Sequence, residues 1–170
     1  DINKIISVSR EENFLFSDHH IKSELSDIET INSILIEEKI NTIYFFIGPS
    51  FPSISFEYII NDIKSCLVPF IELLQLAAQN SIKEIIMMGS AGTVYGSESK
   101  NEFQEDEIIM QENAYGALLK TMENYLILYS KRFDIKYKIL RLSNVFGIYH
   151  ENPVNGIINI AIRKTLQNKP

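Results

Sequence analysis

The sequence predicts an α/β fold with a doubly wound parallel sheet. Short apolar runs rich in β-branched and aromatic residues alternate with longer stretches in which apolar residues recur at helical spacing. Strands that alternate with helices pair in parallel through right-handed crossovers, and we expect helices on both faces of the sheet. The 170 residues, 45% of them hydrophobic, suffice for one core of ordinary domain size.

The N-terminal part contains two candidate strands and a helix. Residues 5–8 form a short β-prone run, and residues 21–25 are a second candidate strand. Apolar residues then recur near helical spacing over residues 26–39, which predicts a helix. Ser26, with Glu29 three residues later, has the pattern of a capping box at its start.

The central part alternates between buried strands and a long helix. Residues 42–47 are continuously apolar, which is typical of a strand buried on both faces. Residues 84–88 form the next such strand, which we expect to end at Gly89. The helical stretch between these strands covers residues 56–80, and a kink is predicted at Pro69 because proline has no backbone donor.

The C-terminal third repeats the alternation. A helix is predicted over residues 114–132, a strand over residues 136–142 and a final helix over residues 154–166. In open parallel sheets, ligands bind at the carboxyl ends of the strands. We therefore expect functional residues in the loops that follow residues 47, 88 and 142.

Composition and isolated residues exclude several classes of function. The 16 basic against 22 acidic residues give a formal charge of −6, which argues against nucleic-acid binding. The apolar runs fall well short of the roughly 18 residues of a membrane span. The single cysteine, Cys66, cannot form an internal disulfide, favours a cytoplasmic location and has the apolar setting of a buried side chain. The adjacent His19 and His20 point to opposite faces of a strand, so no metal site is predicted.

Three segments follow the predicted strands at the expected ligand edge. Residues 89–96 read Gly-Ser-Ala-Gly-Thr-Val-Tyr-Gly, residues 114–116 read Ala-Tyr-Gly, and residues 141–147 read Arg-Leu-Ser-Asn-Val-Phe-Gly. In this order and spacing they resemble the extended short-chain dehydrogenase/reductase family, specifically its NAD-dependent nucleotide-sugar epimerases and dehydratases. Glu123 and the Tyr125-Leu126 pair add to the likeness, which runs from about residue 5 to the C-terminus.

The resemblance implies a Rossmann-like fold, NAD as cofactor and a nucleotide-sugar substrate. It makes Tyr115 the general acid/base for a sugar hydroxyl while NAD takes and returns a hydride. It also implies that Ser90 and Thr93 lie near the substrate hydroxyl and that Asn144 contacts the nucleotide-sugar diphosphate. A homodimer through the helices of residues 56–80 and 114–132 is implied as well.

The catalytic helix departs from the family pattern. Members carry a lysine four residues after the tyrosine, which holds the nicotinamide ribose and lowers the tyrosine pKa from about 10. Here that position is Leu119, which fits the apolar stripe of the helix. Lys120 is next to it, but at about 100° per residue it points roughly 140° away from Tyr115. A π-bulge in this helix could turn Lys120 to the face of Tyr115, where it could act as a catalytic and cofactor-binding residue. Ala91 stands where many members place the catalytic serine or threonine, between Ser90 and Thr93.

The segments expected to bind the cofactor depart further from the family pattern. The Gly-x-Gly-x-x-Gly fingerprint that cradles a pyrophosphate is absent from the sequence. Ser9 and Arg10 stand where an acidic residue would hold the adenosine ribose, so NADP is an alternative to NAD. These departures support a second hypothesis, that of a catalytically degenerate relative that keeps the fold for nucleotide binding or assembly.

Structural roles compete with each functional one. Tyr115 could be a first-turn aromatic of an amphipathic helix, and Asn144 an ordinary strand-to-loop cap. We expect the Ser90 and Thr93 hydroxyls to bond within their own loop. Arg141 is expected to pair with a structural carboxylate rather than with substrate.

The resemblance also predicts what the chain covers. Family members are roughly twice as long, and their first strand lies in the sheet between the strands that correspond to residues 5–8 and 42–47. We therefore interpret residues 1–152 as a partial NAD(P)-binding Rossmann-like domain and residues 153–170 as the start of the substrate-binding lobe. We expect the first strand and most of that lobe to be missing, so that the two strands lack their shared partner.

Overall fold

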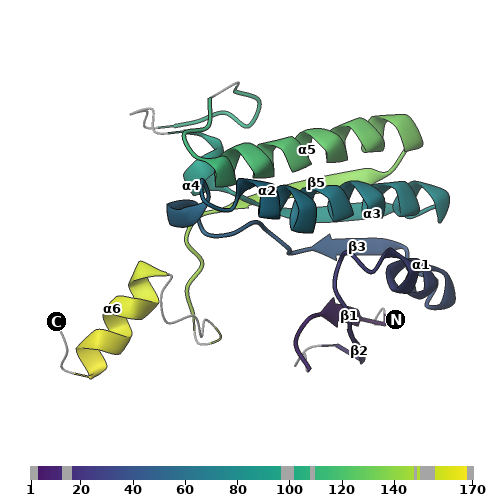
Figure 1. Ribbon diagram of the computed structural model, residues 1–170, viewed down its shortest axis with the longest axis horizontal. Coiled ribbons are helices and arrows are strands. Elements are labelled where there is room, and N and C mark those ends of the chain that lie inside the picture. Colours follow the sequence, from purple (N-terminus) through teal and green to yellow (C-terminus); the bar gives the residue numbers. More distant parts are fainter. Residues whose placement is uncertain are drawn as a thin grey trace.

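The computed structural model describes most of the chain as parallel strands that alternate with helices (Figure 1). The described residues are 4–12, 17–96, 102–107, 110–147, 149 and 156–167. This arrangement confirms the α/β, Rossmann-like parallel class. The predicted division between residues 152 and 153 lies outside the described residues.

A three-stranded parallel sheet is the centre of the molecule. It consists of β3 (Thr42–Phe45), β4 (Glu84–Ser90) and β5 (Lys136–Leu142) in that spatial order. The prediction that Gly89 ends its strand is wrong, because the strand register continues to Ser90, which lies opposite Leu142. β3 is shorter than predicted and ends at residue 45.

Three helices form a layer beside this sheet. They are α1 (Ile28–Glu37), α3 (Val68–Gln79) and α5 (Ala114–Phe133). α3 packs against both α1 and α5, and α5 also packs on β4 and β5 (Figure 1). The core lies between this layer and the sheet, and its fully buried side chains are Phe70, Leu74, Ile85, Met87, Leu119, Met122 and Leu126.

The opposite face of the sheet carries exposed apolar side chains. Tyr44 is 62% exposed and Phe46 67%, and Leu140 and Leu142 on β5 are also exposed. The prediction that residues 42–47 are buried on both faces is therefore wrong for the described structure. The physical reason is that α1, α3 and α5 all lie on the other side, where Phe45 packs on Phe70 with ring centroids 4.6 Å apart.

Two further strands form a separate sheet. β1 (Ile6–Ser9) and β2 (His19–Lys22) pair in parallel, with Ser7 opposite His20. The second strand thus begins two residues before the predicted 21–25. Within the described part of the chain, neither strand is hydrogen-bonded to β3. This confirms the expectation that β1 and β3 lack a common neighbour.

The helix starts and bends differ in detail from the predictions. Asp27, not Ser26, caps α1, because Asp27 Oδ1 accepts a hydrogen bond from the Thr30 amide at 3.2 Å while Ser26 Oγ turns to Glu24. The predicted capping box is therefore wrong by one residue, and the helix begins at Ile28.

The stretch predicted as one helix over residues 56–80 is segmented. A short turn η1 (Pro52–Ile54) and α2 (Ile59–Asp62) precede a π-helical turn, η2 (Ile63–Leu67), and α3 continues from it. Pro69 cannot donate a backbone hydrogen bond, and the wider π turn directly before it accommodates the lost bond without breaking the helix.

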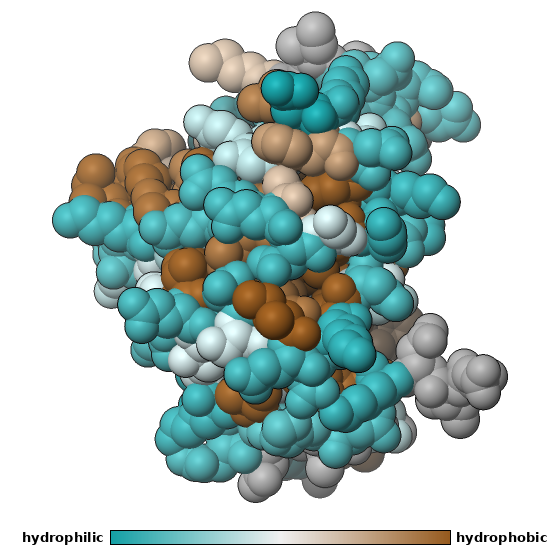
Figure 2. Space-filling view, turned by 90° about the vertical axis from the view of Figure 1, so that its right-hand side faces the viewer, coloured by the Kyte–Doolittle hydropathy of each residue, from teal (hydrophilic) through white to brown (hydrophobic). Residues whose placement is uncertain are grey.

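The C-terminal segment leads away from the sheet. After β5 the chain reaches α6 (Ile157–Leu166), which lies apart from the α3–α5 layer in Figure 1. The predicted start at residue 154 lies outside the described residues. No described helix is both long enough and apolar enough to cross a membrane. Seen from the side, apolar surface lies in patches among hydrophilic side chains (Figure 2).

Candidate active site

The segment that follows β4 packs directly against the start of α5. This segment was predicted to be a loop, but the short helix α4 (Ala91–Val94) forms there. A Cβ added to Gly116 would lie 2.5 Å from the Thr93 carbonyl oxygen, so the close approach of two backbones requires glycine at this position. The structure thus brings Thr93 to the residue next to Tyr115.

The Thr93 hydroxyl is buried and unsatisfied. Its Oγ1 has less than 1 Å² exposed and no hydrogen-bond partner among the described residues. The expectation that this hydroxyl bonds within its own loop is therefore wrong. A buried polar atom without a partner costs about 1–3 kcal/mol, and a polar ligand group that reached Oγ1 would remove this cost.

Tyr115 lies in the first turn of α5. Asn113 caps this helix through its Oδ1, which accepts a hydrogen bond from the Gly116 amide at 2.7 Å. The Tyr115 ring is half-buried against the core, and this burial, with a smaller contribution from Cys66, raises the pKa of its hydroxyl above the usual 10.0. Tyr115 is therefore protonated at neutral pH, when it can donate a proton but is rarely ionised as a base.

The lysine position of the helix is apolar, as predicted. Leu119 is 2% exposed and belongs to the core. Lys120 extends to Glu123, where Nζ lies 3.2 Å from Oε2. Among the described contacts, the charge of Lys120 is thus paired with Glu123 rather than with Tyr115. Its role as a catalytic or cofactor residue stays a prediction.

Glu123 and Arg141 form a buried ion pair. The Glu123 carboxylate is fully buried, and Arg141 donates from Nε to Oε1 at 3.0 Å and from Nη2 to Oε2 at 2.8 Å. The hydrogen bonds to Glu123 raise the pKa of the Arg141 guanidinium. The expectation that Arg141 pairs with a structural carboxylate is confirmed. This guanidinium has two further partners that were not predicted, Tyr95 and Glu105.

The other residues predicted to bind cofactor or substrate lie at the ends of β1, β4 and β5. Ser9 ends β1, and its Oγ accepts a hydrogen bond from the Glu11 amide at 3.2 Å, while Arg10 is exposed beside it. Asn144 is exposed just beyond β5, and Ser90 precedes α4 without capping it through its side chain. Their functional roles stay predictions.

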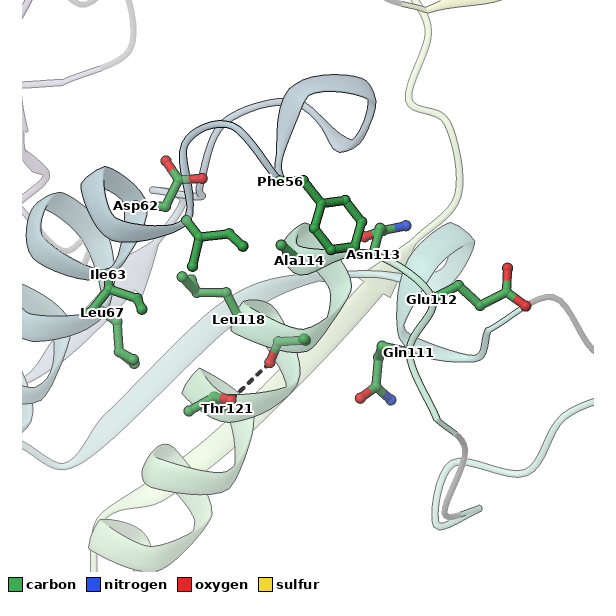
Figure 3. A pocket seen from close by; sticks show the side chains of 12 residues that line it. Phe56, Asp62, Ile63, Leu67, Gln111, Glu112, Asn113, Ala114, Leu118 and Thr121 are labelled. Carbon is green, nitrogen blue, oxygen red and sulfur yellow. Dashed lines mark hydrogen bonds between the residues drawn. The ribbon is translucent and has the colours of Figure 1, made fainter.

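A groove of about 400 Å³ lies between α2, the π turn and α5 (Figure 3). Phe56, Ile63, Leu118 and Thr121 contribute to a mainly apolar lining, and Thr121 Oγ1 donates to the Ala117 carbonyl along α5. Neither Thr93 nor Tyr115 lines this groove, so it is separate from the predicted catalytic residues. In the part of the chain that the structure describes, no three His, Cys, Asp or Glu side chains are grouped to hold a metal.

The fold and the site define a class of protein. Parallel strands that alternate with helices, and polar groups gathered beyond the carboxyl end of β4 at the start of α5, are typical of Rossmann-like nucleotide-binding proteins. The model of the NAD-dependent epimerase/dehydratase family matches residues 3–170. The chain belongs to this family.

Individual relatives agree with this assignment. A putative UDP-glucose 4-epimerase of Methanocaldococcus jannaschii is 34% identical over 101 residues, which are 58% of this chain and 33% of that protein. A putative UDP-arabinose 4-epimerase of Arabidopsis thaliana is 25% identical over 127 residues, which are 75% of this chain and 29% of that protein.

Solved structures share the fold. The UDP-glucose 4-epimerase of Thermotoga maritima, solved with UDP-glucose, superposes with a TM-score of 0.87 at 20% identity and covers 98% of this chain and 56% of that one. The Thermus thermophilus UDP-glucose 4-epimerase, solved with NAD, superposes with a TM-score of 0.87 at 20% identity. The match covers 97% of this chain and 55% of that one. The chain thus spans about a third of these curated relatives and about half of these solved structures.

Proposed function

We propose that the protein is an NAD(P)-dependent epimerase or dehydratase that acts on a nucleotide-activated sugar, with Tyr115 as acid/base. The observation that carries this proposal is the unpartnered, buried Thr93 hydroxyl, which is held against the start of the helix that bears Tyr115. Membership of the NAD-dependent family and the names of the UDP-sugar 4-epimerases that resemble the chain support the cofactor and the substrate class.

The residues present fit one end of the proposed cofactor and substrate site. The Thr93 hydroxyl can hydrogen-bond a sugar hydroxyl, and Tyr115 can exchange a proton with it. Bound NAD would supply the hydride acceptor. Ser9 and Arg10 are the candidates of this chain for the adenosine ribose, and an arginine there suits the 2′-phosphate of NADP.

Turnover by the full-length protein tests the proposal. The protein would be incubated with NAD or NADP and a panel of UDP- and dTDP-sugars, and the products separated by chromatography. We expect product from the wild type and none from Tyr115→Phe, which lacks the proton-transferring hydroxyl. Absence of product across the panel, with the wild type and Tyr115→Phe giving the same result, would contradict the proposal.

A second candidate function is a degenerate relative that binds nucleotides without catalysis. Two observations favour it: Leu119 fills the position of the expected lysine from within the core, and Lys120 is paired with Glu123. Burial also raises the pKa of Tyr115, whereas a lysine beside the hydroxyl would lower it.

Calorimetric titration with NAD, NADP and nucleotide sugars separates the two functions. Binding without turnover, together with turnover gained by Leu119→Lys, would support the degenerate relative. Leu119→Met is the matched control, because it occupies the same core position without a charge. Turnover by the wild type would contradict degeneracy.

We further propose a homodimer formed by the helices of residues 56–80 and 114–132. Both stretches carry exposed apolar side chains, with Ile60 65% exposed and Leu128 59%. The groove of Figure 3 lies between the same helices, and an apolar groove of this kind can receive side chains of a second copy.

A further inference from the structure

We propose that Arg141 is a positioning residue that holds the segment after β4 in place and thereby fixes Thr93 against the start of α5. The inference rests on the proposed function, because it assigns a supporting role for the same site. Arg141 does this from β5, through contacts with Tyr95 and Glu105.

The guanidinium is anchored on one side. Both carboxylate oxygens of Glu123 accept hydrogen bonds, one from Nε and one from Nη2 of Arg141. This pair of bonds fixes the plane of the guanidinium group. Lys120 shares Oε2 and partly neutralises the same carboxylate. A Cβ at Gly89 would lie 3.1 Å from Glu123 Oε1 and 3.3 Å from Arg141 Cγ, so the pair lies tightly against the end of β4.

The remaining nitrogen reaches the segment after α4. Arg141 Nη1 donates to Tyr95 Oη at 2.7 Å and to the Glu105 carbonyl at 2.9 Å. The guanidinium carbon also lies 4.9 Å from the centroid of the Tyr95 ring, which stacks on Phe103 at 5.1 Å. One side chain of β5 therefore binds two separate parts of the segment between β4 and α5.

These contacts constrain Thr93 from one side while α5 constrains it from the other. Tyr95 directly follows α4, and Gln111 donates from Nε2 to the Val94 carbonyl at 3.0 Å. Thr93 itself abuts Gly116. With the C-terminal end of α4 held and Thr93 packed against Gly116, the Thr93 hydroxyl keeps one position beside the Tyr115 turn, which is what a group that orients a substrate hydroxyl requires.

The test compares Tyr95→Phe with Tyr137→Phe in the full-length protein. Tyr95→Phe removes the oxygen that accepts from Arg141 and keeps the ring. Tyr137 lies on β5 like Arg141, is 41% exposed and provides the matched loss of a hydroxyl. Backbone amide exchange of residues 91–96 is measured by mass spectrometry, and steady-state kinetics and NAD affinity are measured on the same samples.

We expect exchange of residues 91–96 to accelerate about tenfold in Tyr95→Phe, because a hydrogen bond to a charged group is lost. We also expect kcat/KM for the nucleotide sugar to fall about tenfold with the Kd for NAD unchanged. Tyr137→Phe should match the wild type in all three measurements.

Several results would overturn the inference. Unchanged exchange in Tyr95→Phe would show that Arg141 does not hold the segment, and faster exchange with unchanged kcat/KM would show that the segment does not position the site. Equal losses of NAD and sugar affinity would indicate a general structural defect. If the wild type has no turnover, the proposed function fails and the positioning of its site fails with it, whereas the exchange data still decide whether Arg141 holds the segment.

Discussion

Cys66 lies in the packing between the π-helical turn and α5, with its Sγ 3.8 Å from Met122 Sδ. Burial, with a smaller contribution from Asp62, raises the pKa of the thiol from 9.0 to about 12. The unfolded chain therefore releases this proton near pH 9, while the folded protein keeps it to about pH 12.

The stability of the wild type should accordingly fall as the pH rises through this window. The folded state binds the extra proton, so its contribution is complete below about pH 9 and lost by about pH 12, with a total of a few kcal/mol. Urea unfolding of the wild type and of Cys66→Ala across the window measures the difference. Parallel curves for the two proteins would show that the thiol does not titrate as described.

Glu123 is the residue on which the ion-pair network depends. Glu123→Gln leaves Arg141 and Lys120 without a buried counter-charge, and removal of one partner of a buried pair costs about 3–5 kcal/mol. Chemical denaturation should show a loss of this order. Glu57→Gln, at an exposed position, should be neutral. A Glu123→Gln protein as stable as the control would refute the energetic role of the pair.

At the residue scale, the type of contact that a side chain makes could be predicted better than the residue that it contacts. Arg141 could be assigned to a structural carboxylate, although no local pattern identified Glu123, and Leu119 could be assigned to the core because it continues an apolar stripe. The bond from Arg141 to Tyr95 joins residues 46 positions apart, so no local pattern reveals it. The unpartnered Thr93 hydroxyl likewise depends on the approach of α5.

At the scale of elements, the start of α5 depends on one side chain. Asn113 Oδ1 accepts from the Gly116 amide, and loss of such a cap costs about 1 kcal/mol. Asn113→Ala should lower the free energy of unfolding by about this amount in denaturant titrations. Asn113→Asp keeps an acceptor oxygen and should retain most of the stability. Equal losses in both variants would contradict the capping role.

The elements that periodicity predicts are the long ones. α5 and β5 have almost the predicted bounds, because a sustained pattern over many residues determines each of them. The π turn before Pro69 and the short helix α4 were missed, since a four- or five-residue turn has no period to detect. β3 was predicted to be buried on both faces because its apolar run does not reveal which face the helices cover.

At the scale of the whole molecule, the sheet is divided where the sequence analysis expected a gap. β1–β2 and β3–β4–β5 form separate parallel sheets, and helices α1, α3 and α5 lie on one side of the larger sheet. The order of the elements could be predicted from their alternation. The exposed sheet face could not, because it depends on what packs against β3 and β5 in three dimensions.

The proposed homodimer makes a prediction at this scale. Leu128→Glu places a charge at an exposed apolar position of α5, and burial of an unpaired charge in the interface should dissociate the dimer. Sedimentation velocity at micromolar concentration should show a dimer for the wild type and a monomer for this variant. Ile36→Glu on α1, 55% exposed but outside the two helices, should remain dimeric. A monomeric wild type would count against the proposal.

The most direct test of the central claim, hydride transfer at the site that Tyr115 and Thr93 define, is product formation together with the transient near-ultraviolet absorbance of enzyme-bound reduced nicotinamide, because each turnover returns the hydride. The full-length protein is mixed with NAD or NADP and a UDP- or dTDP-sugar, and product and absorbance are followed in wild type, Tyr115→Phe and Thr93→Val. The proposed function predicts product and a transient signal in the wild type that fall in both variants. Neither product nor transient signal in the wild type with a broad sugar panel, or equal product and signal in all three proteins, would contradict it.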